Sequence, residues 1–586
     1  MTKLSVAHLS RQLLWAFSAL MFCIFSFVAP YGKTIIITWH LTSIRTISFD
    51  IPLIIDSTTL IFAAVVLFIS ANIVHFSAFY MKDDPFLQRF NALVLLFVLS
   101  ILLLLFLPHL IALLLGWDGL GLVSFLLVIY YQNPKSLAAG IITALTNRIG
   151  DVFLLLRFGL IMHQRHWNIL NIWTSSFNVW ITFMIILAAI TKRAQIPFSR
   201  WLPAAIAAPT PVRALVHSST LVTAGVFLLI RFYPFLSLEP LFNKFLLITA
   251  CTTILIAGAA AIVEWDLKKI IALSTLRQLG VIMASIGLGF PNLALFHLLT
   301  HALFKALLFL TAGSFIAFNS HTQDLRITGA IADQLPLTTA LFITANIALC
   351  GTPFLAGFYS KDLIIEIFLY TPSNVVLSLI LLLATGLTVT YSIRLFITCI
   401  ISPKFLTPLS NTEEKQIPIL FPGRILCLGA IISGAILNWC FLPTLSHPFL
   451  SFPTKILTIS IIITSAIFIW FLLKRSPHLT SPGKSSLANT SLSSMLFLTP
   501  ISSQGIIPAP FKSARLLFLV VDQGWTEKLS GQGIFSAITS SAKPLQLLLT
   551  HPVLQSIILL AILSIPLILM VVCFSSLHLK QSIEAA

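Results

Sequence analysis

The chain has 586 residues, of which 58% are hydrophobic and only 9% are charged. This composition excludes a soluble globular protein and indicates one that crosses a membrane many times. The net charge of +17 falls mostly in short loops and forms no basic patch of the kind that binds nucleic acid. The seven cysteines show no CxxC spacing, so we expect no disulfide framework, no metal site and no iron–sulfur cofactor.

Apolar runs of membrane-spanning length predict about 15 transmembrane helices. The first is 12–29, which lacks a small-residue cleavage site and is therefore interpreted as a membrane helix rather than a signal peptide. The segment 31–51 is rich in threonine and isoleucine and partly alternating, which predicts an extended hairpin outside the bilayer. A second span is expected over 53–79.

Two blocks of five spans follow. The expected spans are roughly 88–107, 109–131, 137–161, 178–208 and 210–233 in the first block, and 243–263, 267–289, 292–318, 336–368 and 373–400 in the second. The fourth span of each block is broken, by Pro197 and Pro203 in the first and by Pro353 with Gly351 and Gly357 in the second. Unwound backbone is tolerated at membrane depth only inside protein or beside a wet cavity. Breaks at the same place in two odd-numbered blocks predict two inverted repeats.

Three more spans are expected near 422–442, 455–473 and 554–573. The stretch near 514–529 has the pattern of a helix lying along the membrane surface, although nearby glycines argue against one uninterrupted helix. We thus predict an all-α polytopic membrane protein. Its expected regions are 1–87 with the first helices and the hairpin, 88–233 and 243–400 with the two repeats, 401–474 with additional helices, 475–550 with the loop and the lateral amphipathic segment, and 551–586 with a C-terminal anchor helix.

The span 292–318 carries an ionisable stripe. His297, His301 and Lys305 are four residues apart, so a helix places all three on one face. A lysine at mid-membrane costs roughly 2.5–3.5 kcal/mol, which favours a functional group facing a hydrated cavity. A structural lysine that snorkels to the interface fits less well, because long apolar flanks lie on both sides of Lys305. A His-x-x-x-His pair also binds metals, but no carboxylate or cysteine accompanies it on that face.

The first block carries a second group of charges. Asp118 lies mid-span in a glycine-rich motif, and Arg148 and Asp151 form an i, i+3 pair on the next span. Lys192 lies on the broken span and is expected to form an acid–base pair with Asp118. Desolvation favours the neutral amine and a nearby carboxylate favours the ammonium, so moving the carboxylate would switch proton binding. The alternatives are static ion pairs for the carboxylates and an interfacial anchor for Lys192, which adjoins Arg193.

Two further candidates follow the helix breaks. His217 begins an apolar helix beside hydroxyl residues that can hold a water chain, unless it is merely hydrogen-bonded. Lys361 and Asp362 follow the second break and repeat the arrangement of an ionisable group beside an unwound helix.

Six motifs occur along the chain. They are GWDGLG at 116–121, NRIGD at 147–151, APTPV…LVHSST at 208–220, DLKKIIALST at 266–275, THALFKA at 300–306 and GFYSKD at 357–362. In type and order they resemble chain 5 of mitochondrial NADH–ubiquinone oxidoreductase, and VDQGWTEK at 521–528 resembles the C-terminal region of that family more loosely.

The resemblance implies the distal antiporter-like subunit of respiratory complex I, with two inverted five-helix repeats, a long lateral helix and no redox cofactor. It also implies a proton route. The route of the family begins at a carboxylate, which would be Asp118 here, where many relatives have glutamate. It would continue through Lys192, His217, Lys305 with its upstream histidines, and Lys361. Aspartate in place of glutamate keeps the charge but shortens the reach toward the lysine.

We therefore expect a proton-conducting subunit of complex I in the mitochondrial inner membrane, with other membrane-arm subunits, lipids and protons as partners. Quinone reduction in partner subunits would supply the free energy, so the chain would belong to an NADH:ubiquinone reductase without holding a redox centre. A subunit of a related cation/proton antiporter is the alternative, which bound sodium or exchange by the isolated subunit would favour. A passive membrane scaffold is a third interpretation, against which the line of ionisable residues argues.

Overall fold

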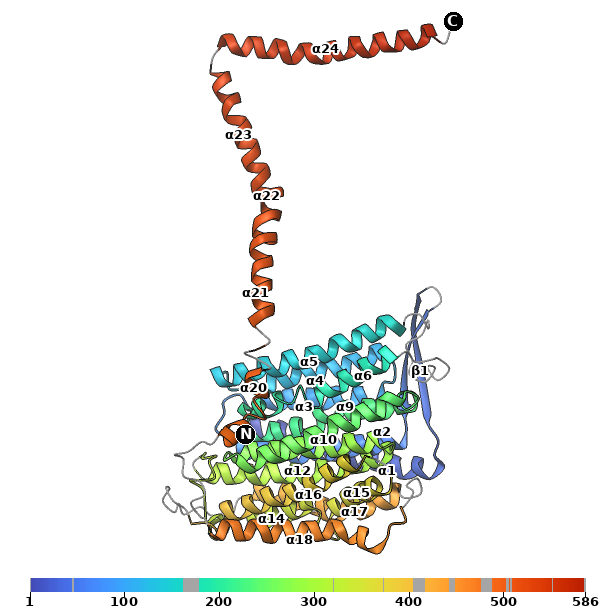
Figure 1. Ribbon diagram of the computed structural model, residues 1–586, viewed down its shortest axis with the longest axis vertical. Coiled ribbons are helices and arrows are strands. Elements are labelled where there is room, and N and C mark those ends of the chain that lie inside the picture. The colour runs from blue at the N-terminus through green and yellow to red at the C-terminus, as the bar shows by residue number, and fades with distance from the viewer. Residues whose placement is uncertain are drawn as a thin grey trace. The chain divides into compact units, whose positions relative to one another are not determined.

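The computed structural model describes residues 2–44, 47–161, 179–319, 321–371, 374–403, 417–441, 448–475, 487–501, 505, 508–550 and 552–583. The secondary-structure elements of these residues are helices apart from one β-hairpin, and turns and loops join them (Figure 1). The chain divides into two units, Met1–Thr499 and Pro500–Ala586.

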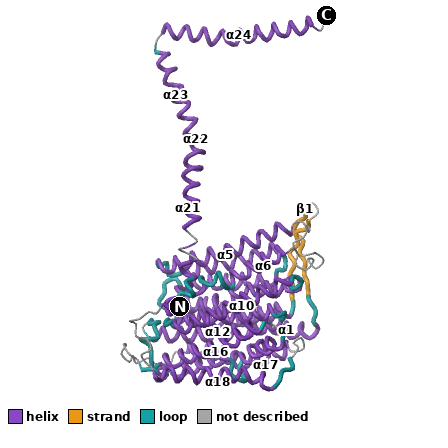
Figure 2. The backbone as a smooth tube through the Cα atoms, in the orientation of Figure 1, coloured by secondary structure: helices purple, strands orange, loops and turns teal. Residues whose placement is uncertain are grey.

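The N-terminal part contains helix α1 (Thr2–Val28), strands β1 (Ile35–Ile44) and β2 (Ile47–Ile55), and helix α2 (Ser57–Tyr80). The two strands pair antiparallel, with Ile35 opposite Ile55, which confirms the predicted hairpin (Figure 2). The predicted start of the second span at 53 was wrong. The strand runs on to Ile55, and Asp56 and Thr59 form a capping box that begins α2.

The first block contains one interrupted helix, as predicted. Its elements are α3 (Leu87–Phe106), α4 (Leu110–Val128), α5 (Pro134–Ile161), α6 (Val179–Lys192), α7 (Trp201–Ala204), η4 (Ala205–Ala207), α8 (Thr210–Val212), the π-helix η5 (Arg213–Thr220) and α9 (Leu221–Leu236). Helix α6 ends at Lys192, and Ala194 then adopts a left-handed φ of 56°. The chain therefore leaves the helix directly after a charged side chain.

The second block has its interruption at the corresponding place. Its elements are α10 (Pro240–Val263), α11 (Leu267–Gly287), α12 (Pro291–Phe318), α13 (Ile331–Gln334), α14 (Pro336–Cys350), the π-helix η6 (Phe358–Asp362), α15 (Leu363–Tyr370), α16 (Val375–Phe396) and the π-helix η7 (Ile397–Ile401). Gly351 ends α14 with a left-handed φ of 88°. A Cβ atom on Gly357 would lie 1.9 Å from the Ala348 carbonyl oxygen, so only glycine allows this return of the chain.

The last helices of the first unit are α17 (Ile417–Phe441), α18 (Phe452–Arg475) and α19 (Leu487–Ser493), and the short helix α20 (Leu498–Pro500) spans the boundary between the units. The expected start of α17 at Pro422 was wrong, because this proline lies inside the helix. Among the described residues, thirteen helices are long and apolar enough to cross a membrane. Two shorter apolar helices, α6 and α14, precede the breaks, and together these elements account for the predicted number of spans.

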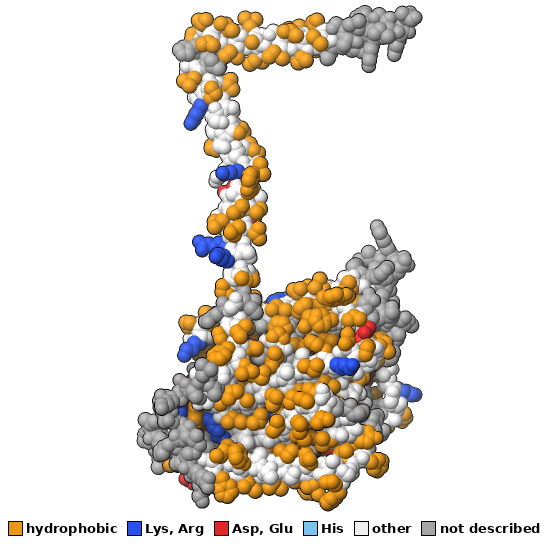
Figure 3. All heavy atoms as spheres, viewed as in Figure 1, with side chains coloured by type: hydrophobic (Ala, Val, Ile, Leu, Met, Phe, Trp, Pro, Cys, Tyr) orange, Lys and Arg blue, Asp and Glu red, His pale blue; other side chains and the backbone are white. Residues whose placement is uncertain are grey.

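Helix α12 lies at the centre of the first unit. It packs against α2, α11, α14 and α17, and its membrane-length segment is completely buried. The peripheral helices expose large apolar side chains instead, for example Leu145 and Leu155 on α5 (Figure 3). The outside of this unit is therefore suited to lipid, while several charged side chains, among them Lys192 and Lys305, are buried inside it.

The second unit consists of α21 (Pro508–Leu517), the π-helix η10 (Phe518–Thr526), α22 (Glu527–Leu529), α23 (Gly531–Leu549) and α24 (Pro552–Ile583). The stretch 514–529 is helical throughout, and the helical path breaks at Ser530, so the expected interruption is found only at the end of this stretch. No residue of α21, η10 or α22 is buried. A lateral position of this segment on the membrane surface stays a prediction.

Candidate functional site

The predicted stripe on α12 is buried throughout. His297, His301 and Lys305 all have an exposed fraction of 0%. The ring centroids of the two histidines are 6.2 Å apart, as expected for successive turns of one face. The Lys305 Nζ donates to the Ser274 Oγ on α11 at 2.5 Å, and among the described residues no carboxylate forms an ion pair with Lys305. A lysine held by one hydroxyl and no counter-ion is poorly suited to carry a permanent charge.

Hydroxyl groups connect the histidines to the second broken helix. One ring nitrogen of His297, Nδ1, lies 2.9 Å from the Ser360 Oγ on η6, and Nε2 lies 3.4 Å from the Gln278 Oε1 on α11. The Thr300 hydroxyl also reaches the Ser360 Oγ, at 3.0 Å. Neither ring nitrogen of His301 has a hydrogen-bond partner among the described residues, which leaves ordered water as its natural partner.

Lys361 is positioned by the break itself. Its Nζ donates to the Cys350 carbonyl at 2.9 Å and to the Thr388 Oγ1 on α16 at 3.3 Å. Because α14 ends at Cys350, this carbonyl has no intrahelical partner and is free to accept from the ammonium. The next residue, Asp362, is 4% exposed, and neither carboxylate oxygen has a hydrogen-bond partner in the described part of the chain.

Lys192 contacts a tryptophan rather than a carboxylate. Its Nζ donates to the Trp117 carbonyl oxygen and lies 3.9 Å from the centroid of the same indole ring. The indole Nε1 of Trp117 in turn donates to the Asp151 Oδ1 at 2.8 Å. A Cβ atom on Gly150 would lie 2.2 Å from the Thr191 Oγ1, so glycine lets α5 approach α6 closely beside this cluster. Trp117 thus separates a buried base from a buried acid and contacts both.

Arg148 is shared between the two carboxylates of this cluster. Its Nη1 lies 3.5 Å from the Asp118 Oδ2 and 3.4 Å from the Asp151 Oδ2. The expected direct pair of Asp118 with Lys192 is not formed: the Asp118 side chain is 38% exposed in the isolated chain and turns to the arginine. Asp151, with 9% side-chain exposure, is the deeper carboxylate. The structure therefore brings all four predicted charges together, but with Asp151 on the inside.

Several buried guanidinium groups were not predicted. Arg157, Arg193 and Arg213 are at most 1% exposed, and none of their side-chain nitrogens has a hydrogen-bond partner among the described residues. The alternative interpretation of Lys192 as an interfacial anchor does not fit the structure, because Lys192 and the adjacent Arg193 are both 0% exposed. The side chain of His217 lies outside the described residues, although its backbone belongs to η5.

Sequence reasoning missed the neutral groups that hold the charged ones, namely Trp117, Ser274, Gln278, Ser360 and Thr388. Three of them lie in charged motifs, which was the available signal: Trp117 precedes Asp118, Ser360 precedes Lys361, and Ser274 belongs to the motif at 266–275. The contacts of Ser274 and Thr388 join different helices, and spacing within one helix carries no information about them.

Three family models match nearly the whole chain. The model described as NADH-Ubiquinone oxidoreductase (complex I), chain 5 N-terminus matches 39–91, NADH:quinone oxidoreductase/Mrp antiporter, TM matches 108–388, and NADH dehydrogenase subunit 5 C-terminus matches 391–572. NADH-ubiquinone oxidoreductase chain 5 of Lumbricus terrestris is 48% identical over 90% of this chain and 92% of its own length. The chain belongs to the NADH-ubiquinone oxidoreductase chain 5 family. Chain 5 proteins of Anopheles gambiae, with 42% identity over 87% of this chain and 89% of the relative, and of Mytilus edulis, with 37% identity over 87% and 90%, are also similar.

Two solved structures share the fold of this chain 5 protein. A chain of the Mrp complex from Dietzia sp. superimposes with a TM-score of 0.70 at 22% identity, over 90% of this chain and 62% of that chain. A chain of the membrane-bound sulfane sulfur reductase, an archaeal respiratory membrane complex, gives a TM-score of 0.70 at 19% identity, over 92% of this chain and all of that one. The predicted helical, antiporter-like fold class is thereby confirmed.

Proposed function

We propose that this chain 5 protein is the proton-translocating membrane-arm subunit of complex I in the mitochondrial inner membrane, and that its buried ionisable residues carry the protons. Other complex I subunits are its partners and hold the redox centres. The observation that supports the proposal most directly is α12, a fully buried membrane helix with three titratable side chains on one face. A scaffold has no use for such groups, because each costs free energy in an apolar interior.

Protons enter the route at the cluster around Trp117. Arg148 lies at almost equal distances from Asp118 and Asp151, and both contacts are long, so a small movement of its side chain would strengthen one pair and weaken the other. When Arg148 turns to Asp118, the charge of Asp151 acts on Lys192 and favours the ammonium. When Arg148 turns to Asp151, that effect weakens and Lys192 releases its proton. A movement of one arginine thus sets the proton affinity of Lys192.

The proton then passes to the centre of the subunit. His217 lies on η5, which packs against α12. On α12, Lys305 is the central acceptor, because the Ser274 hydroxyl binds it whether or not it is charged. His301 and His297 continue the proton route from Lys305 toward Ser360, which contacts the His297 ring. Lys305 and His301 are one helical turn apart.

Release occurs on the far side, through Lys361 and Asp362. The His297 ring and Lys361 are linked through Ser360, the residue before Lys361 on η6. Asp362 is buried beside Lys361 without a hydrogen-bond partner among the described residues, so it acts as an acceptor when a proton arrives. Before the proton is released, the Cys350 carbonyl at the helix break accepts a hydrogen bond from the Lys361 ammonium.

The test replaces Lys305 in assembled complex I that is reconstituted into vesicles, and it measures the protons pumped per NADH oxidised. Lys305→Ala removes the carrier. Lys305→Arg keeps the charge but does not release its proton at physiological pH, since the guanidinium pKa exceeds about 12. Both variants should assemble and pump poorly. Lys244→Arg, the same exchange at an exposed position of α10, is the matched control and should pump normally.

Near-normal pumping by Lys305→Arg would refute the carrier role and leave Lys305 as a fixed charge. Subunit content, measured in parallel, separates loss of pumping from loss of assembly. The related cation/proton antiporter makes a different prediction: the isolated subunit would exchange sodium for protons without any electron transfer.

A further inference from the structure

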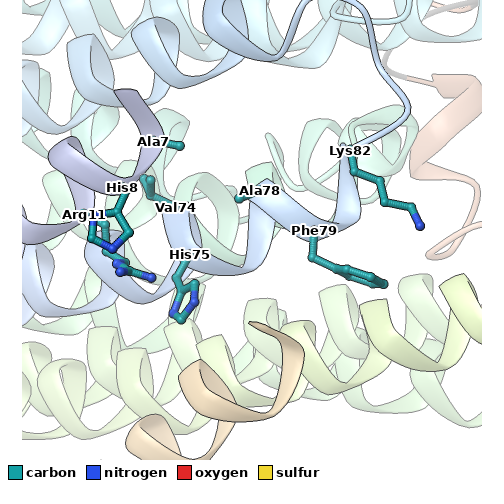
Figure 4. A pocket seen from close by; sticks show the side chains of 8 residues that line it. All are labelled: Ala7, His8, Arg11, Val74, His75, Ala78, Phe79 and Lys82. Carbon is teal, nitrogen blue, oxygen red and sulfur yellow. The ribbon is translucent and has the colours of Figure 1, made fainter. Parts of the chain in front are cut away.

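A cavity of about 390 Å³ lies between α1 and α2, away from the buried ionisable line. His8 and Arg11 of α1, His75 of α2 and Lys82 just beyond α2 line it (Figure 4). Its remaining walls are apolar and include Phe79 of α2. The cavity therefore combines up to four cationic side chains with a hydrophobic surface, and no acidic side chain from the described part of the chain lines it.

The cavity lies at one end of a helix pair that borders the membrane. It is formed by the beginning of α1 and the end of α2, and the two helices pack against each other. The outer face of α1 exposes large apolar side chains, among them Leu9 at 60%, Leu13 at 50% and Phe17 at 51%. An apolar outer face next to a cationic helix end is the arrangement found where a membrane helix meets the headgroup layer.

The polar groups of the cavity are donors. The Lys82 ammonium lies 5.4 Å from the centroid of the Phe79 ring, so a charge stands directly over the apolar wall. The His75 Nδ1 is buried and has no hydrogen-bond partner among the described residues. Arg11 presents a planar fork that suits the oxygens of a phosphate. Asp83 and Asp84 follow in the loop but do not line the cavity.

We propose that this cavity binds an anionic phospholipid, with its phosphate beside Arg11 and His8 and an acyl chain along Val74 and Phe79, while Lys82 at the other end of the cavity adds to the positive potential (Figure 4). Basic pockets between membrane helices are suited to such headgroups. A free anion would use the cations but not the apolar wall, and an uncharged lipid would use the wall but not the cations. One phospholipid molecule satisfies both features, and the site is separate from proton transfer.

The test uses the assembled complex in phosphatidylcholine nanodiscs. Traces of a photoreactive phosphatidylglycerol or phosphatidylcholine, with the reactive group on the acyl chain, are added, and labelled peptides are mapped. Phosphatidylglycerol should label the α1 and α2 peptides of the unmodified protein. Each cation near the surface contributes roughly 1 kcal/mol, or about fivefold in affinity, so the double variant Arg11→Gln, Lys82→Gln should lose labelling roughly 30-fold.

Lys135→Gln is the matched control. Lys135 is exposed at the start of α5. The start of α5 lies on the same side of the membrane as the end of α2, because α3 and α4 between them each cross the bilayer once. Its labelling should equal that of the unmodified protein. The charge-retaining pair Arg11→Lys, Lys82→Arg should keep most of the labelling. If the double Gln variant does not assemble, each single variant should lose labelling about fivefold.

Three results would overturn the proposal. One is equal labelling by the two lipids, which would make the cations irrelevant. Another is absence of labelling in the assembled complex, which would place a partner subunit in the cavity. The third is displacement of the label by excess inorganic phosphate, which would indicate a site for a free anion.

Discussion

Replacing the buried arginines with serine should stabilise this protein. Arg193 is the clearest case, because its side chain is 0% exposed and its guanidinium has no hydrogen-bond partner in the described part of the chain. An uncompensated buried charge costs about 3–5 kcal/mol. The cavity left by the shorter side chain offsets about 1–3 kcal/mol of this. Arg193→Ser should therefore raise the stability by about 2 kcal/mol, and Arg213→Ser should act in the same direction. Arg157→Ser should gain less, because the Arg157 guanidinium lies 3.9 Å from the centroid of the Phe232 ring.

The assay is thermal unfolding of the assembled membrane arm, with subunit retention followed by native electrophoresis. Lys192→Ser is the matched control on the preceding residue, and it should abolish pumping without the same gain. A clear loss of stability in Arg193→Ser would refute the reasoning, since it would mean that the guanidinium has a partner and contributes favourably.

Three further outcomes are expected. Asp118→Asn should lower proton pumping per NADH while leaving assembly intact, and Asp118→Glu should have a far milder effect. Asp151→Asn should lower pumping more than Asp118→Asn does, because Asp151 is the more deeply buried carboxylate. Full pumping by Asp151→Asn would exclude Asp151 from the proton route. Asp56→Asn should destabilise the subunit by about 3–5 kcal/mol, because it leaves the partly buried Arg231 without its ion-pair partner, and unchanged thermal unfolding would show that the pair contributes nothing. Truncation before Lys512 should weaken assembly more than it changes pumping by complex that does assemble, and normal assembly would argue against a clamping role for the second unit.

The elements predicted from sequence were those specified by local pattern. The stripe of His297, His301 and Lys305 follows from helical periodicity alone, and the structure places all three side chains on one buried face. The two helix breaks follow from proline and glycine, whose backbone limits do not depend on context. The β-hairpin was equally local, and only its end at Ile55 required the capping interaction of Asp56 to be known.

The partners of the charged groups were not specified by local pattern. Whether Asp118 or Asp151 faces Lys192 depends on how α4, α5 and α6 are rotated against one another. Gly150 contributes by letting α5 approach Thr191 of α6 closely, and a sequence motif does not reveal this contact between helices. The Ser274 hydroxyl that binds Lys305 comes from another helix. The π-helical turns after both breaks also lack a sequence signal, because they reflect how the chain resumes its helix inside a packed bundle.

The indole of Trp117 gives this subunit an optical probe of its own proton uptake. A positive charge 3.9 Å from the ring centroid shifts the absorption and emission of an indole, and the shift disappears when the amine of Lys192 becomes neutral. The difference spectrum between the unmodified complex and Lys192→Met isolates this one chromophore from the other tryptophans of the chain. Time-resolved near-ultraviolet spectroscopy during NADH oxidation can therefore follow the charging of a single buried amine, with no label attached to the protein.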